Sequence, residues 1–461
     1  MHSVFKNSFG VPVGHTAYLR KRSTVTLTII ILNVLIYLIT SYNNFFLESS
    51  DYWANIGGFI PSLISEPSQW YRLITSMFLH ADFFHILFNM YFLYIFGRAV
   101  EEALGETRFF LLYFVSGIMA SVFHAAFSFI GGPLSYVVPA IGASGAISGI
   151  LGAYLMLYPG TSLVIGTIFF MFPIFLPIKA SYYLVFWFAM QILYGYTKAA
   201  GSTAVFAHAG GFIAGIALLP LLVDRTRLSQ LKFIEHIRTL PYLLFGHYTA
   251  EGLSTSTKII LVSLITPLLI GSLFTLVLPS SQNDIKSVFV QYNYEGASYS
   301  DYVVVQLPNV ESYLPDASFG ETKILLTRLY AAKLLYNKTY ANRELNLSNL
   351  SIELPVNVVL GSLTKVVNVN TTIIYFKGSY DNDGFLSYGE GNLSTQLIII
   401  QGYGIYLSYY PVSYEFKISS STINFSNAVR YAGMVSLVVA VTALITVLRK
   451  DKELTLVSEY Y

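Results

Sequence analysis

The feature that most constrains this chain is a series of apolar runs, each long enough to cross a lipid bilayer. A helix needs about 20 apolar residues to span the hydrocarbon core. Hydrophobic residues make up 54% of the 461 residues and charged residues 11%, as in membrane proteins. Eight segments qualify: 25–41, 80–98, 108–130, 139–158, 180–197, 204–223, 259–279 and 429–448. We therefore predict an α-helical polytopic membrane protein, and we interpret the Pro-containing run 163–178 as a re-entrant or surface hairpin.

The distribution of Lys and Arg predicts the orientation of these spans. With the N-terminus in the cytoplasm, most basic residues near span ends lie inside, and Arg72 and Lys198 remain in short outer loops. The run Val25–Ile39 follows a basic segment, but no small-residue cleavage site comes after it, so we interpret it as a span and not as a signal peptide. We expect both termini in the cytoplasm and residues 280–428 outside the cell membrane.

Composition also argues against several classes of function. A net charge of +2 provides no basic field for nucleic acid, so we expect none as a partner. The chain has no cysteine, which excludes disulfides, haem thiolates, iron–sulfur clusters and Cys-based zinc sites. We expect no cofactor and no metal.

The outer segment 280–428 differs in character from the rest of the chain. Its apolar residues alternate with polar ones in 287–294, 302–307, 365–376 and 396–409, which predicts a β-rich domain. All six Asn-x-Ser/Thr sequons of the chain fall here, and glycosylation is possible at Asn337, Asn346, Asn349, Asn370, Asn392 and Asn424. Such sequons in a chain without cysteine suit an archaeal cell membrane.

These patterns together predict seven parts. The order is a cytoplasmic segment 1–24, a six-helix core 25–223, a cytoplasmic linker 224–258, a seventh span 259–279, the β-rich domain 280–428, an eighth span 429–448 and a cytoplasmic tail 449–461.

Candidate catalytic residues lie at one level in three predicted spans. Ser144, in Gly142-Ala-Ser-Gly145, lies about five residues into its span, and His208 and His85 lie about four and five residues into theirs. At a rise of about 1.5 Å per residue, all three lie roughly 7 Å below the outer surface. Because polar and ionisable groups are costly inside a membrane, we interpret them as one functional site.

Small residues explain how the two helices that carry Ser144 and His208 come close. Each helix has two glycines four residues apart, Gly145 with Gly149 and Gly211 with Gly215. Neither span contains Asp or Glu, so the pattern predicts a Ser144–His208 dyad without the acid of a triad. His85 and Asn89 share one helix face, and both can donate to an oxyanion beside the backbone N–H of Ser144.

Five motifs occur in order over roughly residues 20–223. They are Trp70-Tyr-Arg72 with the residues up to His80, His85-Ile-Leu-Phe-Asn89, Glu101-x-x-x-Gly105, Gly142-Ala-Ser144-Gly145, and Ala207-His208-x-x-Gly211-x-x-x-Gly215. In this series the chain resembles rhomboid intramembrane serine proteases. The resemblance implies a six-helix core, Ser144 as nucleophile, His208 as base, His85 with Asn89 as oxyanion donors, and single-span or polytopic membrane proteins as substrates.

The sequence departs from the family at one position near the nucleophile. Some members carry an aromatic residue four positions after the serine, stacked on the catalytic histidine, and here this residue is Ser148.

Two other classes of function stay open. The chain could be an inactive rhomboid-like protein that binds transmembrane helices without cleaving them. It could also be a metal or haem protein that uses the histidines of one leaflet, His80, His85, His124 and His208.

Overall fold

The computed structural model divides the chain into two compact units. It describes residues 11–15, 23–131, 133–169, 172–199, 204–243, 252–277, 285–317, 319–360, 363–401, 404–423 and 425–457. The helical unit comprises 1–50, 57–280 and 426–461, and the β-rich unit comprises 51–56 and 281–425.

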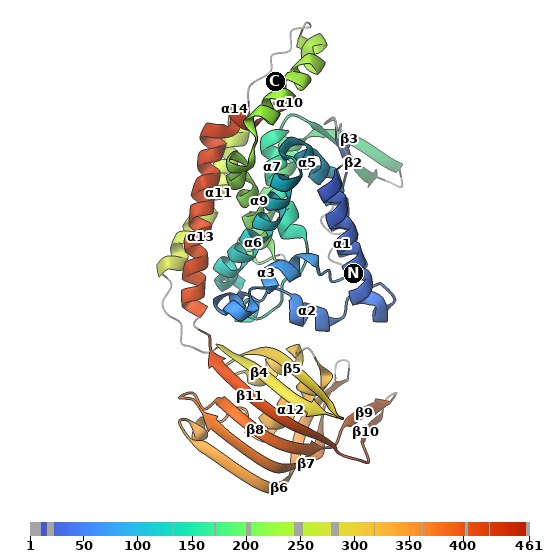
Figure 1. The fold of residues 1–461 in the computed structure, drawn as a ribbon, viewed down its shortest axis with the longest axis vertical. Helices are drawn as coiled ribbons and strands as arrows, with labels where there is room; N and C mark the ends of the chain where they lie inside the picture. Colours follow the sequence, from blue (N-terminus) through green and yellow to red (C-terminus); the bar gives the residue numbers. More distant parts are fainter. Residues whose placement is uncertain are drawn as a thin grey trace. The chain divides into compact units, whose positions relative to one another are not determined.

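Helices form at all eight predicted spans (Figure 1). The long helices are α1 (Thr24–Ser41), α4 (Phe83–Phe92) with its continuation α5 (Arg98–Leu104), α6 (Glu106–Gly131), α7 (Ser144–Leu157), α8 (Ala180–Thr197), α9 (Val205–Leu222), α11 (Thr255–Val277) and α13 (Phe425–Ile445). Within the described residues, six helical segments are long and apolar enough to cross a membrane, and α7, with 14 residues, is shorter. The chain is therefore a polytopic membrane protein with a separate β-rich unit.

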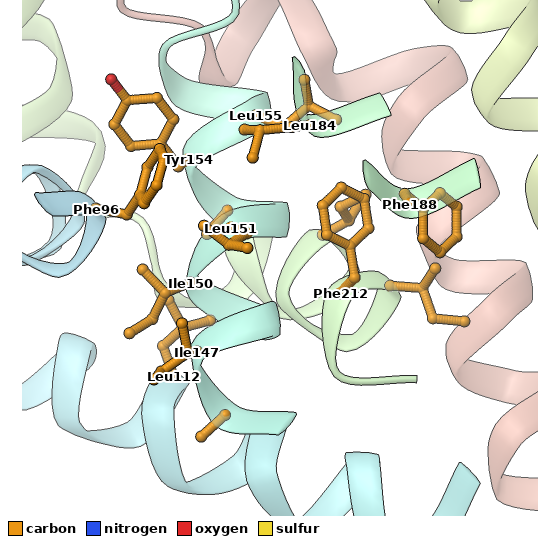
Figure 2. Packing of buried hydrophobic residues seen from close by; sticks show 14 of the residues in the cluster. Phe96, Leu112, Ile147, Ile150, Leu151, Tyr154, Leu155, Leu184, Phe188 and Phe212 are labelled. Carbon is orange, nitrogen blue, oxygen red and sulfur yellow. The ribbon is translucent and has the colours of Figure 1, made fainter. Parts of the chain in front are cut away.

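Helix α7 is buried along nearly its whole length. Every residue from Gly145 to Leu157 is buried, because α6, α9 and the helical segment around Phe96 cover its sides. Figure 2 shows this core at close range. There the ring of Tyr154 meets Phe96 edge-on at 4.9 Å, and Phe188 of α8 stacks on Phe212 of α9 at 4.6 Å. A helix hydrophobic all round is expected in such a central position.

The predicted close approach of α7 and α9 is confirmed. A methyl group added at Gly211 would collide with the carbonyl oxygen of Gly145, and one added at Gly215 would collide with that of Gly149. These partners are backbone atoms, which cannot turn aside as a flexible side chain can. The two helices therefore touch backbone to backbone, as small-residue interfaces allow in membranes.

The C-terminal residues of the described chain complete the far end of α7. The Leu456 N–H donates to the Leu157 carbonyl at 2.7 Å, and the Thr455 hydroxyl donates to the Met156 carbonyl at 3.0 Å. Lys258 pairs with the buried Asp451 at 2.7 Å. The last carbonyls of a helix lack partners within the helix, so this segment satisfies groups that would otherwise be unpaired. The sequence did not indicate this contact.

The proline-containing run 163–178 forms a β-hairpin. Strands β2 (Ser162–Phe169) and β3 (Phe172–Lys179) pair antiparallel, and β1 (Val11–His15) pairs with β2. The hairpin prediction is confirmed. The sequence did not predict the α-helices α3 (Arg72–Thr75), α10 (Arg225–Leu243) and α14 (Asp451–Leu454) of this unit.

The β-rich unit contains one six-stranded antiparallel sheet in the order β5-β4-β11-β8-β7-β6 (Figure 1). Its strands are β4 (Ile285–Tyr294), β5 (Ala297–Gln306), β6 (Glu344–Leu360), β7 (Leu363–Tyr380), β8 (Leu386–Thr395) and β11 (Val412–Thr422). Helix α12 (Gly320–Ala331), which the sequence did not predict, packs against β6. The short helix α2 (Asp51–Gly57) lies largely in this unit.

Alternation along the strands separates two faces of this sheet. On β11, Tyr414, Phe416 and Ile418 are buried, whereas Glu415 and Lys417 are exposed. A period of two places successive side chains on opposite faces. One face therefore forms the core of the unit and the other carries polar groups.

The predicted strand 396–409 is wrong as a single element. It comprises two short strands, β9 (Ile398–Gln401) and β10 (Gly404–Leu407), which pair antiparallel with each other. Alternation with a period of two does not reveal where a chain reverses direction.

Five of the sequon asparagines lie among the described residues. Asn346, Asn349 and Asn370 are exposed, Asn337 and Asn392 are partly exposed, and Asn424 lies outside the described residues. Glycosylation stays a prediction.

The two aspartates of the turn after β7, Asp381 and Asp383, pair with the buried Lys286 at 2.8 and 2.6 Å.

We predict that Gly215→Ala lowers the thermal stability of the purified protein. The added methyl group meets the backbone of Gly149, so the helices must separate, and overpacking of this kind costs about 1–3 kcal/mol. The unfolding midpoint in detergent should fall by several degrees. Gly320→Ala is the control, because no atom lies within 4 Å of its added methyl group. A wild-type midpoint for Gly215→Ala would contradict the backbone contact.

Candidate active site

Ser144 is the first residue of α7. The prediction that it lies five residues inside a helix is wrong, because the chain before it is not helical. Ala140 pairs with Phe59 in an isolated β-bridge, and Gly142 has a φ of +123°, a conformation that favours glycine. Ser144 therefore stands at a helix N-terminus, where backbone N–H groups have no partner within the helix and the helix dipole favours negative charge.

His208 lies in the first turn of α9 and faces Ser144. Its Nε2 lies 2.8 Å from the Ser144 Oγ, which is hydrogen-bond distance. The structure thus brings together the two side chains that the sequence paired across 64 residues. A hydroxyl in this position can pass its proton to a neutral imidazole.

The sequence analysis missed one residue of this cluster, Gln191 of α8. Its Oε1 lies 3.0 Å from the Nδ1 of His208, and its side-chain nitrogen lies 3.5 Å from the carbonyl oxygen of Trp187. Gln191 is 9% exposed. An amide inside an apolar span is a signal that could have identified it, because such groups need partners in the membrane.

His85 approaches the site from α4. Its Nδ1 accepts a hydrogen bond from the N–H of Ala81 at 3.3 Å, so the ring proton sits on Nε2. A methyl group added at Gly142 would lie 2.7 Å from this Nε2 and 3.6 Å from the Ser144 Oγ. The absence of a side chain at Gly142 therefore leaves space between the Nε2 of His85 and the Ser144 hydroxyl.

Asn89 lies one turn further along α4. Its side-chain nitrogen donates to the carbonyl of His85 at 2.9 Å, and the residue is 8% exposed. The structure thus places Asn89 on the predicted face of the helix, with its amide bonded within its own helix.

His80 is fully buried and contacts the loop before Ser144. The N–H of Ala143 donates to its Nε2 at 3.4 Å, and its ring meets that of His85 edge-on at 5.1 Å. His80 therefore supports the backbone that leads to Ser144.

A small cavity of about 40 Å³ opens beside Ser144. It is lined by apolar and small residues of several helices, among them Met77, Gly117, Ala120 and Ala207, and by His124. A cavity of about 10–15 Å³ by this kind of measure already holds one water molecule. The cavity beside Ser144 therefore has room for a small group.

The histidines of the rival metal hypothesis do not form a metal-binding group within the described residues. Across the part of the chain that the structure describes, no group of three or more His, Asp or Glu side chains is arranged to hold a metal ion. His124 instead borders the cavity and lies 6.3 Å from the ring of Phe59.

Other motif residues hold the frame around the site. Arg72 is 2% exposed and donates to the carbonyl of Gly58 at 2.9 Å. The carboxylate of Glu101 accepts the backbone N–H groups of Val25 and Thr26, at 2.9 and 2.8 Å. It thereby satisfies the start of α1 with a group from another helix.

Comparison with known proteins matches the same region. The Rhomboid domain model matches residues 67–225. The chain is 44% identical over 89 residues to the putative rhomboid protease YdcA of Bacillus subtilis, which covers 19% of this chain and 42% of that protein. It is 31% identical over 137 residues to the rhomboid protease AarA of Providencia stuartii, covering 28% of this chain and 49% of the relative.

One further relative carries a different name. The inactive RHOMBOID-like protein 8 of Arabidopsis thaliana is 32% identical over 101 residues, covering 22% of this chain and 27% of that protein. In all three relatives the match spans less than half of the relative's length.

We predict that Ser144 reacts covalently with a fluorophosphonate probe. Its hydrogen bond to His208 activates the Ser144 hydroxyl, so labelling should vanish in Ser144→Ala and slow by at least about a hundredfold in His208→Ala. In-gel fluorescence of the purified protein measures the rate. Ser148→Ala is the control, because the Ser148 hydroxyl donates to the Ser144 carbonyl and not to the imidazole. Persistent labelling of Ser144→Ala would show that another residue is the nucleophile.

Proposed function

Since this chain belongs to the rhomboid family through its residues 67–225, we propose that it is a serine endopeptidase that cleaves membrane proteins in or near their transmembrane segments. The observation that carries the proposal is the 2.8 Å contact between the Ser144 Oγ and the His208 Nε2 at the N-terminus of α7. The proposed nucleophile is Ser144, and the proposed general base is His208.

The reaction follows from this geometry in two stages. The Ser144 oxygen attacks the scissile carbonyl carbon while its proton passes to the Nε2 of His208. The imidazolium then returns this proton to the leaving amine, and the C–N bond breaks to leave an acyl-serine. In the second stage His208 takes a proton from water, the hydroxide attacks the ester, and Ser144 is released with its proton.

Charge on the tetrahedral oxygen needs donors at the same place. The backbone N–H of Ser144 lies at a helix N-terminus, and the Nε2 of His85 lies beside Gly142, close to the serine. Both would stabilise the oxyanion. Asn89 would contribute if its amide turned from the carbonyl of His85 toward the substrate.

The orientation of the protein in the membrane is part of the proposal. The bias of Lys and Arg supports cytoplasmic termini, and the clustered sequons support an outer location for residues 280–428. In this arrangement the Ser144 end of α7 faces the outer leaflet of the cell membrane.

A non-catalytic function is the second candidate. It is favoured by one observation, that a matched relative is named inactive. Against it, this chain holds Ser144 and His208 within hydrogen-bond distance. An escort of transmembrane helices would bind substrate but release no cleavage product even in the wild type.

We predict that Ser144→Ala, His208→Ala and the double variant share one background rate of substrate cleavage. Nucleophile and base act as a unit, so their losses do not add. His85→Ala and Asn89→Ala should retain activity reduced by about 10²–10³-fold, because the remaining oxyanion donors still act. Cleavage of a model transmembrane substrate in liposomes measures these rates.

Each of these variants must first be shown to be folded by its thermal unfolding curve. Near-wild-type turnover by Ser144→Ala would overturn the protease proposal.

We also predict a small residue on the acyl side of the cleaved bond. The cavity beside Ser144 is small, at about 40 Å³, and is lined by small and apolar residues, so we expect it to favour Ala or Ser over Leu or Phe. Replacing Ala by Leu at the mapped site should lower kcat/KM by at least about tenfold. Met77→Ala enlarges the cavity and should recover part of the loss for the larger residue. Equal rates for both substrates in the wild type would show that the cavity does not determine substrate specificity.

A further inference from the structure

We propose that Gln191 is a positioning residue that sets the tautomer and ring orientation of His208, in the place that an acid occupies in a catalytic triad. The inference rests on the proposed protease function for its kinetic consequence. The other part of the proposal, which ring nitrogen of His208 carries the proton, can be tested without any activity.

A backbone carbonyl sets the direction of the hydrogen bonds around His208. The oxygen of Trp187 can only accept, so the side-chain NH₂ of Gln191 faces it, at 3.5 Å. This contact is long, but it leaves the Oε1 of Gln191 to face His208. That oxygen also can only accept, so the Nδ1 of His208 must be the donor across 3.0 Å.

The position of the proton on the His208 ring determines whether the nitrogen that faces the Ser144 hydroxyl can accept its proton. A neutral imidazole carries one proton, and with this proton on Nδ1 the lone pair lies on Nε2. Nε2 is the atom that lies 2.8 Å from the Ser144 Oγ. Gln191 therefore selects the one neutral tautomer in which His208 can accept the serine proton.

Among the described residues, the side chain at position 148 and the ring of Trp187 give His208 no second hydrogen bond that would select a tautomer. Position 148 holds a serine whose hydroxyl donates to the Ser144 carbonyl at 2.6 Å, so no aromatic ring stacks on the imidazole from this position. The ring of Trp187 lies 6.2 Å away and is tilted by 35°. An aromatic face can restrict a ring plane, but it does not distinguish one nitrogen from the other.

A role in helix packing alone would have different consequences. Helices α8 and α9 are already joined by the stacked rings of Phe188 and Phe212 and by the contact of Gly195 with Phe206. Loss of one amide should therefore leave the two helices together. The tautomer of His208 would change only if Gln191 sets it.

Three variants of the full-length protein in detergent separate these possibilities. Gln191→Leu removes the acceptor at similar size, Gln191→Glu keeps an acceptor oxygen, and Asn33→Leu is the control. Asn33 is a buried intramembrane amide on α1 that donates to its own helix at Ile29, as Gln191 does at Trp187. The readouts are kcat and KM with a model transmembrane substrate, and the ¹⁵N chemical shifts of the His208 ring.

We expect the wild-type spectrum to show the proton on Nδ1. Gln191→Leu should populate both tautomers and lower kcat by about 10–100-fold, with KM changed by less than about twofold. Gln191→Glu should restore the Nδ1–H state and most of kcat. Asn33→Leu should match the wild type in both readouts, whatever its stability.

A proton on Nε2 in the wild type, or an unchanged kcat in Gln191→Leu, would overturn the proposal. If Gln191→Leu does not fold, the wild-type and Gln191→Glu spectra decide it. Absence of cleavage by the wild type would instead overturn the protease function, and the spectrum would still decide the state of His208.

Discussion

The contact between the backbones of α7 and α9 is the constraint on which the rest of the site depends. Gly211 and Gly215 lie against the carbonyls of Gly145 and Gly149, where a single methyl group has no room. At this separation short side chains on the two helices can meet, and Ser144 reaches His208 at 2.8 Å. Without a hydrophobic force between helices in lipid, such packing is a main source of association.

Close packing also makes every polar group near the site expensive unless it has a partner. In the structure, hydrogen bonds to these buried polar groups offset the free energy lost when they are removed from water. Ala81 sets the proton of His85, Gln191 faces His208, and His80 accepts the N–H of Ala143. The far end of α7 is completed in the same way by residues 455–457. Both ends of this short, buried helix thus make hydrogen bonds to other segments of the chain, through the Ser144 hydroxyl at one end and the Met156 carbonyl at the other.

The elements of the helical unit could be predicted because long apolar runs have one stable form in a bilayer, the helix. The ends of the helices were harder to predict from the sequence. Ser144 is the first residue of α7 because the conformation of Gly142 and the pairing of Ala140 keep the preceding chain from being helical. In the β-rich unit, alternation identified strand segments but not the reversal between β9 and β10 or the helix α12.

The sequence by itself determined that this is a polytopic membrane chain, and it paired Ser144, His208 and His85 as one candidate site through their common depth and the glycines beside them. These inferences follow from periodicity and from the cost of polar groups in lipid, which are local properties of the chain. Only the tertiary structure decided that Gln191 contacts His208 and that His85 carries its proton on Nε2. A hydrogen bond between side chains depends on the rotation and spacing of separate helices, and no property of a single segment contains that information.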